Sequence, residues 1–378
     1  MIIGVLKEQA PETRVSLVPE VVAALVKLKA EVWIESGAGD HAFFDDNSYI
    51  TAGAQIKSRA DITAGAKLLL TMHGDNVPDN LNSHAVILGV YQPLYNAGQM
   101  QQWAMKGYTV FSMDTIPRTT RAQAMDVLSS QANIAGYKAV LLAAYQYSRY
   151  FPMFMTAAGS IPPAKVLILG AGVAGLQAIA TAKRLGAVVE VFDTRPAVKE
   201  EVMSLGAKFV EVEGAADASK AGGYAVEQSA EFQQRQKEKI HEHAKKADII
   251  ITTAQIPGRK APILITKEMI EDMRAGSVII DIASVTGGNT ELTRNNETVL
   301  HKGVTIIGNS ALPATAPSDA SKVYSKSVLN FLKLVIDKDG SLHLDFNDDL
   351  VKGTCIAHAG SITNERVQSI ITPQTANA

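Results

Sequence analysis

Three closely spaced glycines are the first residues in the sequence whose pattern indicates chemistry. Gly170, Gly172 and Gly175 follow the apolar stretch Val166–Leu169 and open a segment with helical spacing. Glycines in the pattern G-x-G-x-x-G allow a tight turn and bring the backbone close to a pyrophosphate. The amino end of the next helix, near Val173, then faces that anion. The pattern predicts a dinucleotide site.

An acidic residue at the end of the next predicted strand indicates which dinucleotide binds. The strand at Val188–Phe192 is followed by Asp193, about 20 residues after the last glycine. A carboxylate there can accept two hydrogen bonds from the adenine ribose, and it repels the 2′-phosphate of NADP(H). An arginine at the position of Arg195 can bind that phosphate, but Asp193 lies at the strand end itself and is therefore given more weight. We therefore predict NAD(H) as the cofactor, the alternative being a strand–turn–helix that binds no nucleotide.

A second group of polar residues precedes the longest predicted helix. Arg118, Gln123 and Asp126 bring a cation, an amide and a carboxylate into one short stretch, and Gln123 and Asp126 share a face if that stretch is helical. These residues can cap a helix and form ion pairs, or they can hold a nicotinamide and its ribose. The second interpretation needs no proton acceptor if the hydride partner is another nicotinamide, because hydride transfer between two such rings releases no proton.

An ordinary NAD-dependent dehydrogenase also needs a group that accepts a proton while the hydride leaves. The opening of the chain, with Lys7-Glu8 and Arg14, resembles alanine dehydrogenases. In that family a lysine follows one later strand and a histidine follows the next. The corresponding stretches here, 70–74 and 88–92, lack them. The stretch 281–288 also departs from the family's pattern of an aspartate before a Gly-Gly pair. These differences argue against amino-acid oxidation.

Five long motifs point to one family: Arg118–Tyr137, Met155–Pro163, Gly170–Gly186, Ala221–Tyr224 and Ile251–Pro257. Over essentially its full length, the chain resembles the NAD(H)-binding domain I of proton-translocating nicotinamide nucleotide transhydrogenases. The resemblance implies direct, Re/Si-specific hydride transfer between NAD(H) here and NADP(H) on a partner subunit. Membrane-spanning partner subunits would couple this transfer to proton translocation.

The resemblance also implies roles for individual residues. Arg118, Gln123 and Asp126 match a loop beside the nicotinamide and are the catalytic candidates, Gln123 reaching toward the partner's nucleotide; Ser129 lies on the next helical turn. The other cofactor-binding candidates are Gly170, Gly172, Val173 and Gly175 at the pyrophosphate, Asp193, Thr194 and Arg195 at the adenosine ribose, and Gly223 and Tyr224 in a mobile loop over NAD(H). For the stretch 214–246 around that loop, we expect one of two structures. It forms a mobile lid over the nucleotide, or it forms an exposed helix within a long surface connection.

The alternation of apolar strands with helical segments predicts an α/β fold with parallel sheets and right-handed crossovers. We expect two Rossmann-like domains joined by a long helix, with a cleft between them. We expect a discontinuous N-terminal domain of residues 1–125 and 311–378, a bridging helix of residues 126–150, and an NAD-binding domain of residues 151–310. Within the last stretch, Ser341–Phe346 and Thr354–His358 alternate like a strand pair.

The composition excludes several other classes of protein. The formal net charge of −2 over 378 residues provides no basic excess for a nucleic acid. Cys355 is the only cysteine, which excludes an internal disulfide and a cysteine-based metal cage, and no metal site is expected. The longest uncharged apolar run, 166–182, is shorter than the about 20 residues of a spanning helix.

The lack of a spanning segment predicts a cytoplasmic chain. The resemblance implies a homodimer that partner subunits hold at the cytoplasmic face of the inner membrane. Two rival functions stay open from the sequence. One is an NAD-dependent amino-acid dehydrogenase of the alanine type. The other is a module that binds NAD without catalysing any hydride transfer.

Overall fold

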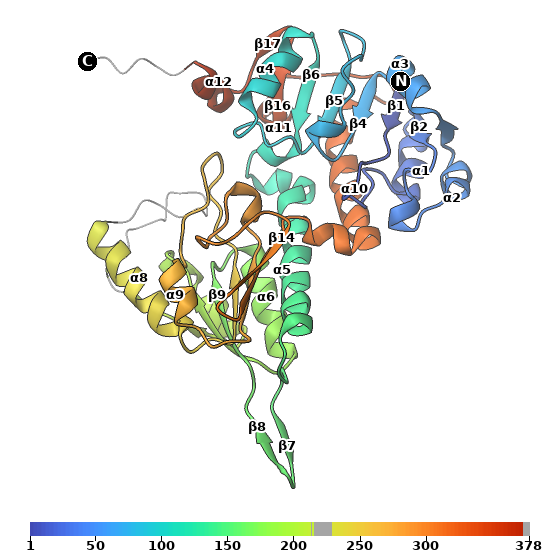
Figure 1. Cartoon of the computed structure of the whole chain (residues 1–378). Helices are drawn as coiled ribbons and strands as arrows, with labels where there is room; N and C mark the ends of the chain where they lie inside the picture. The colour runs from blue at the N-terminus through green and yellow to red at the C-terminus, as the bar shows by residue number, and fades with distance from the viewer. Residues whose placement is uncertain (213, 215–228, 373–378) are drawn as a thin grey trace, which may run out of the picture. The chain divides into compact units, whose positions relative to one another are not determined.

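The computed structural model describes residues 1–212, 214 and 229–372 of the chain. The chain divides into two compact units, each with its own sheet (Figure 1). Unit 1 comprises Met1–Gln131 and Ala314–Ala378, and unit 2 comprises Ala132–Pro313. Within the described residues, no helix is both long and apolar enough to cross a membrane.

The sheet of unit 1 has eight strands in the order β17-β16-β6-β5-β4-β1-β2-β3. The parallel strands are β1 (Ile2–Val5), β2 (Glu31–Glu35), β3 (Gln55–Lys57), β4 (Leu68–Leu70), β5 (Val86–Gly89) and β6 (Thr109–Ser112). The sheet continues with β16 (Cys355–His358), which pairs antiparallel with β6, and with β17 (Ser361–Ile362), which pairs antiparallel with β16. The strand order reverses between β1 and β4, as in doubly wound Rossmann-type sheets.

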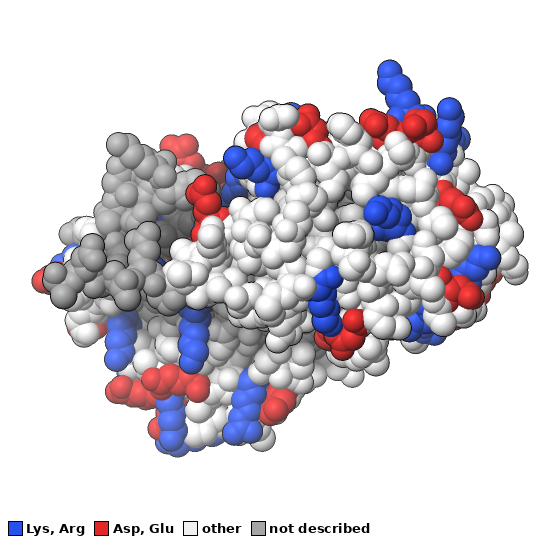
Figure 2. Space-filling view, turned by 90° about the horizontal axis from the view of Figure 1, so that it is seen from above, with Lys and Arg blue, Asp and Glu red and all other residues white. Residues whose placement is uncertain are grey.

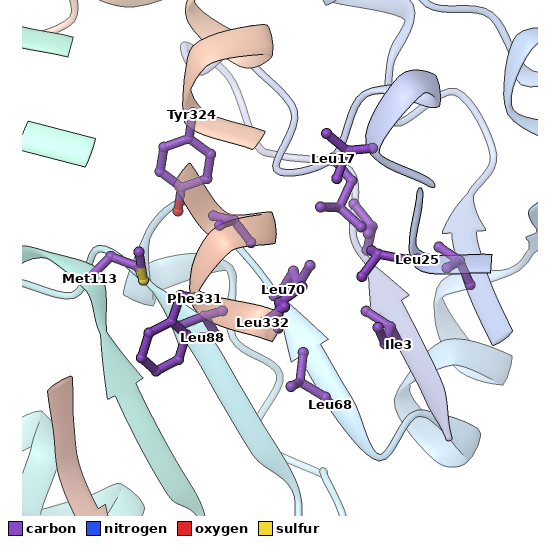
Figure 3. Close-up of a cluster of buried hydrophobic side chains, with 14 of the residues drawn as sticks. Ile3, Leu17, Leu25, Leu68, Leu70, Leu88, Met113, Tyr324, Phe331 and Leu332 are labelled. Carbon is purple, nitrogen blue, oxygen red and sulfur yellow. The ribbon is translucent and has the colours of Figure 1, made fainter. Parts of the chain in front are cut away.

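The helices of unit 1 cover both faces of this sheet. They are α1 (Pro19–Lys27), α2 (Asp46–Thr51), α3 (Arg59–Gly65), α4 (Ala97–Met105), α10 (Pro317–Val335), α11 (Asp349–Thr354) and α12 (Glu365–Ile371). Neighbouring strand residues alternate between the faces: Leu68 and Leu70 belong to the core under α10, whereas Leu69 belongs to the core that contains Trp103 of α4. Figure 3 shows the first of these cores, including Tyr324, Phe331 and Leu332 of α10 and Leu68, Leu70 and Leu88 of the sheet.

The predicted pairing of Ser341–Phe346 with Thr354–His358 is wrong. Only Leu342 in the first stretch forms a bridge, an isolated one to Ile336. The second stretch contains β16, which pairs antiparallel with β6. The alternation in Ser341–Phe346 arises because Leu342, Leu344 and Phe346 pack against the core under α10 without a neighbouring strand.

Unit 2 contains a seven-stranded sheet in the order β11-β10-β9-β12-β13-β15-β14. Its parallel strands are β9 (Lys165–Leu169), β10 (Val188–Phe192), β11 (Lys208–Phe209), β12 (Ile249–Thr252), β13 (Val278–Asp281) and β15 (Val304–Gly308); β14 (Glu297–His301) runs antiparallel at the edge. The order reverses between β9 and β12, so the crevice in which doubly wound folds bind ligands lies between these two strands. The predicted α/β class with Rossmann-like sheets is confirmed.

The helices of unit 2 are α5 (Val127–Gln146), which begins in unit 1, α6 (Val173–Arg184), α7 (Lys199–Ser204), α8 (Ala230–Ala244) and α9 (Lys267–Glu271). The helix predicted at 126–150 is therefore shorter than expected. It ends early because Tyr147 and Phe151 turn into the core, where the Phe151 carbonyl accepts a hydrogen bond from the amide of Ala164.

Helices α5 and α6 approach each other closely. A Cβ on Gly136 of α5 would lie 2.0 Å from the carbonyl oxygen of Ala174 in α6, so only glycine fits at this contact. A small hairpin of β7 (Phe154–Thr156) and β8 (Gly159–Ile161) follows α5 and projects from unit 2 (Figure 1). On the face drawn in Figure 2, basic and acidic side chains are interspersed rather than gathered into a basic surface.

Candidate nucleotide site

The glycine turn connects the end of β9 to the start of α6. Gly170 has φ +105°, and a Cβ there would lie 2.4 Å from the Thr253 hydroxyl oxygen. A Cβ on Gly175 would lie 1.9 Å from the Gly170 carbonyl oxygen. A Cβ on Gly172 would meet no described atom within 4 Å. The first and third glycines are therefore required by packing, whereas the second leaves open space beside the turn.

This open space lies at the amino end of α6. The helix begins at Val173, and Gly172 at the N-cap position provides no side-chain acceptor for the first helical amides. Unsatisfied amides at a helix amino end attract anions. The turn and the helix together can hold a pyrophosphate at the carboxyl edge of β9, where the strand order reverses.

Asp193 joins the end of β10 to the glycine turn. Its Oδ2 accepts a hydrogen bond of 2.7 Å from the amide of Ala171. Arg195 donates to the same carboxylate from its backbone amide at 2.8 Å, from Nε at 2.9 Å and from Nη2 at 2.7 Å. The Asp193 side chain is only 6% exposed. Four donors thus occupy the carboxylate, and Thr194 between the two partners is half-buried.

The ion pair with Asp193 raises the pKa of the Arg195 guanidinium. The arginine charge is therefore balanced within the site rather than left to attract a 2′-phosphate. A carboxylate at this strand end provides acceptors for ribose hydroxyls, and the paired arginine is not left to bind a 2′-phosphate, so both features are those expected of a site for NAD(H) rather than NADP(H).

The second predicted group lies in unit 1, between β6 and α5. A short 3₁₀ helix, η4 (Thr120–Met125), carries Gln123, whose side chain is exposed. Asp126 precedes α5 and caps it: the Ser129 amide donates to Oδ1 at 2.9 Å, and the Ser129 hydroxyl donates to Oδ2 at 2.6 Å. Arg118 is exposed at the beginning of this stretch. The helix-cap interpretation thus describes the contacts of Asp126.

The sequence pattern missed the residues that hold this exposed stretch. Arg121 forms ion pairs with Asp348 and Asp349 at the start of α11. Asn330 of α10 donates from Nδ2 to the carbonyl oxygen of Ala124 at 3.0 Å. These partners lie about two hundred positions along the chain, so no local pattern indicates them.

A buried polar cluster at the carboxyl ends of β1 and β4 was also missed. Glu12 forms a bidentate pair with Arg14, with Nε–Oε1 at 2.8 Å and Nη2–Oε2 at 2.6 Å, and His73 Nε2 lies 2.8 Å from Oε2. Although burial raises the pKa of Glu12, hydrogen bonds from Arg14 and His73 hold it well below its usual range. Nearby, Glu8 accepts the Met72 amide at 2.6 Å, and burial raises its pKa to about 7.

The structure thus brings the glycine turn, Asp193 and Arg195 together in unit 2, and it places Arg118, Gln123, Asp126 and Ser129 near one another in unit 1. Gly223 and Tyr224, predicted in a mobile loop, lie outside the described residues. Of the stretch 214–246, the structure describes α8, whose His241 and His243 engage Asp272 and Glu190 separately.

Comparisons with known proteins are consistent with this arrangement. The family descriptions "Alanine dehydrogenase/PNT, N-terminal domain" and "Alanine dehydrogenase/PNT, C-terminal domain" match residues 4–135 and 139–365. The chain is 45% identical to the first portion of the NAD(P) transhydrogenase alpha subunit of Rhodospirillum rubrum, covering 96% of this chain and 98% of the relative. It is 26% identical to the alanine dehydrogenase of Mycolicibacterium smegmatis, covering 97% of this chain and 96% of the relative.

A solved structure supports the same assignment. The transhydrogenase from Sinorhizobium meliloti superposes with a TM-score of 0.87 at 42% identity, covering 96% of this chain and 100% of that structure. The chain therefore belongs to the alanine dehydrogenase/PNT family and, within it, to the NAD(P) transhydrogenase alpha subunits.

Proposed function

We propose that this chain is the NAD(H)-binding subunit of a proton-translocating transhydrogenase. Hydride passes directly between NAD(H) held here and NADP(H) on a partner subunit, and membrane-spanning partners couple the transfer to proton movement at the cytoplasmic face of the inner membrane. The observation that carries the proposal is the open glycine turn at the amino end of α6, with Asp193 fixed beside it by the Ala171 amide.

The proposed cofactor contacts follow from that geometry. The pyrophosphate faces Gly170, Gly172, Val173 and Gly175, and the adenosine ribose faces Asp193, Thr194 and Arg195. The ribose hydroxyls compete with Arg195 for the carboxylate, because a carboxylate offers about four acceptor positions and four donors already occupy them.

The proposed roles of the unit 1 residues are orientation rather than proton transfer. Arg118, Gln123, Asp126 and Ser129 position the nicotinamide and its ribose, and the cap between Asp126 and Ser129 fixes the start of α5. Gln123 extends toward the partner's nucleotide. Because hydride exchange between two nicotinamides releases no proton, rate enhancement depends on alignment of the two rings.

A direct assay tests the function. The chain is mixed with an NADP-binding domain from the same family, and reduction of an NAD analogue by NADPH is followed by absorbance. Transfer that requires both proteins supports the proposal. NADH binding without transfer would leave a non-catalytic NAD-binding module, and NAD-dependent oxidation of alanine with release of ammonia would establish the amino-acid dehydrogenase instead.

We further propose a homodimer that buries the hairpin β7–β8 and the outer face of α5. Two-stranded hairpins are at best marginally stable alone in water. This one nevertheless exposes 40% of Phe154 and 72% of Met155, and α5 exposes 43% of Tyr137 and 85% of Tyr145. Such apolar exposure on a projecting element is typical of an interface between subunits.

A pair of matched substitutions tests the dimer by light scattering coupled to size-exclusion chromatography. Met155→Asp is expected to yield a monomer. Met105→Asp is the control, because Met105 on α4 of unit 1 is 71% exposed and lies outside the proposed interface. A dimeric Met155→Asp variant, or a natural chain that is monomeric at high concentration, would refute the assignment.

A further inference from the structure

The exposed residue Gln123 lies between two residues that the fold buries. In the 3₁₀ helix η4 (Thr120–Met125), Ala122 is 3% and Met125 is 7% exposed, and both belong to the core under α10. A 3₁₀ helix has three residues per turn, so Ala122 and Met125 share one face. That face is packed, whereas Gln123 is exposed. The fold thus anchors η4 on one side and presents Gln123 to solvent.

A side chain of α10 holds the backbone directly after Gln123. Asn330 donates from Nδ2 to the carbonyl oxygen of Ala124 at 3.0 Å. Asn330 is half-buried, and the next two residues of α10, Phe331 and Leu332, are buried in the core that η4 also contacts. Apolar packing is not directional, so it leaves a short helix free to rotate slightly. The hydrogen bond is directional and therefore sets the orientation of η4.

A second hydrogen bond joins α10 to the first turns of α5. Gln131 donates from Nε2 to the carbonyl oxygen of Ala320 at 3.1 Å, and its Oε1 accepts a hydrogen bond of 2.7 Å from Arg14 Nη1. Arg14 is 8% exposed and is fixed by its bidentate pair with Glu12. Helix α10 therefore forms hydrogen bonds with this stretch on both sides of Asp126.

The ion pairs of Arg121 with Asp348 and Asp349 hold the same stretch less firmly. The Arg121 side chain is 51% exposed in both pairs. Exposed ion pairs contribute little to stability, and salt screens them. The hydrogen bond of Asn330 joins two neutral groups, so salt does not screen it in this way. At physiological ionic strength, the orientation of Gln123 therefore depends more on Asn330 than on Arg121.

We propose that Asn330 is a positioning residue for hydride transfer, which acts by holding the backbone that carries Gln123. This inference rests on the proposed function, in which Gln123 extends toward the partner's nucleotide. Asn330 itself contacts neither nucleotide. A misplacement of about 1 Å can slow a reaction by about a hundredfold, and the loss of one among several contacts has a smaller effect.

The first test removes the donor to the Ala124 carbonyl and leaves Gln123 in place. In Asn330→Ala we expect hydride transfer to slow by about tenfold, while the affinity for NADH changes by less than about twofold. Stopped-flow kinetics of the full chain with an NADP-binding domain of the family measures the rate, and calorimetric titration measures the affinity. Asn82→Ala is the matched control, because Asn82 Nδ2 donates to the Ala64 carbonyl oxygen, also at 3.0 Å, in another part of unit 1. The control should change neither quantity.

A double-mutant cycle separates the positioning of Gln123 from a general structural effect. In a chain that already carries Gln123→Ala, the further change Asn330→Ala should slow transfer by less than about twofold, because no side chain remains there to be placed. Asn330→Asp retains the side-chain volume but presents an oxygen to the Ala124 carbonyl. It should slow transfer at least as much as Asn330→Ala, and it decides the question if the alanine variant does not fold.

The outcomes separate the inference from the function on which it rests. A natural rate of transfer in Asn330→Ala or in Asn330→Asp would overturn the proposal. A loss of rate that persists in full beside Gln123→Ala, an equal loss in Asn82→Ala, or an NADH affinity that falls as much as the rate would also overturn it, since each means a general structural role. If the natural chain transfers no hydride with the partner, the proposed function itself fails, and the inference fails with it.

Discussion

Replacing Asp193 by asparagine separates its structural role from its role in cofactor binding. In the variant, the asparagine oxygen still accepts hydrogen bonds from the two Arg195 groups that donate to Oδ1 of the natural aspartate. Its NH₂ group, however, faces two other donors, the Ala171 amide and Arg195 Nη2. Two charge-assisted hydrogen bonds are lost in a site where Asp193 is 6% and Arg195 19% exposed. Breaking a buried ion pair costs about 3 kcal/mol, which lowers the melting temperature of a unit of about 200 residues, such as unit 2, by roughly 6–12 °C.

The effect on binding is smaller than the number of ribose hydroxyls suggests. In the chain without nucleotide, the carboxylate already holds four donors, so ribose binding exchanges hydrogen bonds instead of adding two new ones. A net loss of about 2 kcal/mol corresponds to roughly a thirtyfold weaker affinity for NADH. Calorimetric titration with NADH measures this, and thermal unfolding checks the stability in parallel.

Arg195→Ala is the matched control. It leaves the hydrogen bond between the Ala171 amide and Asp193 intact and frees acceptor positions for the ribose, so NADH affinity is expected to stay level or rise. NADH affinity that is unchanged in Asp193→Asn would refute the assignment of the carboxylate to the ribose. An equal fall in both variants would show that the contact of Arg195 with the ribose outweighs its competition for the carboxylate, contrary to the exchange argued above.

Three further predictions follow from other contacts. Gln123→Asn should slow hydride transfer by about a hundredfold with little change in NADH affinity, because it alters only ring alignment; stopped-flow kinetics with the NADP-binding partner and an NADH titration test this, and equal changes in rate and affinity would contradict it. Gly175→Ala should abolish NADH binding and lower the melting temperature, because the new Cβ would lie 1.9 Å from the Gly170 carbonyl oxygen; a soluble variant with normal affinity would be inconsistent with this contact. Burial raises the pKa of Glu8 from 4.5 to about 7. Between pH 4.5 and about 7 the folded chain therefore holds a proton on Glu8 that the unfolded chain has released, and the free energy of unfolding falls as the pH rises through this range. Glu8→Gln retains an acceptor for the Met72 amide, and it should raise the free energy of unfolding by about 3 kcal/mol at pH 8 and by less at pH 5; urea unfolding at both pH values measures the difference, and an equal effect at both would argue against a proton at Glu8.

Local spacing was sufficient to predict the glycine turn between β9 and α6. Gly170, Gly172 and Gly175 are close in sequence and lie between one strand and one helix, although the packing of Gly170 also involves Thr253, which follows β12. The contact of Asp126 with Ser129 is likewise local, because three positions separate a helix cap from the amide that it accepts. The sequence predicted these residues together, but it could not decide between a cap and a nicotinamide contact, since both use the same carboxylate.

Contacts across the fold were beyond the reach of such patterns. Arg121 pairs with Asp348 and Asp349, and Asn289 closes a loop that begins at Ala254. Each partner reaches its place through the order of strands in a sheet, which depends on crossovers and on the packing of both faces. The wrong strand prediction at Ser341–Phe346 has the same origin. Alternation of apolar and polar residues shows that one face of a segment is buried, but it does not show whether another strand pairs with that segment.

The sequence by itself therefore determined the α/β class, the glycine turn and the acidic strand end, because these depend on backbone freedom, periodicity and charge over short distances. Tertiary structure alone decided which groups share a site. It buried the ion pair between Asp193 and Arg195, it buried Glu8 and thereby raised the pKa of that residue to about 7, and it connected Asn289 to the loop beside the glycine turn. Desolvation and long-range pairing set these properties, and both exist only once the two sheets have formed.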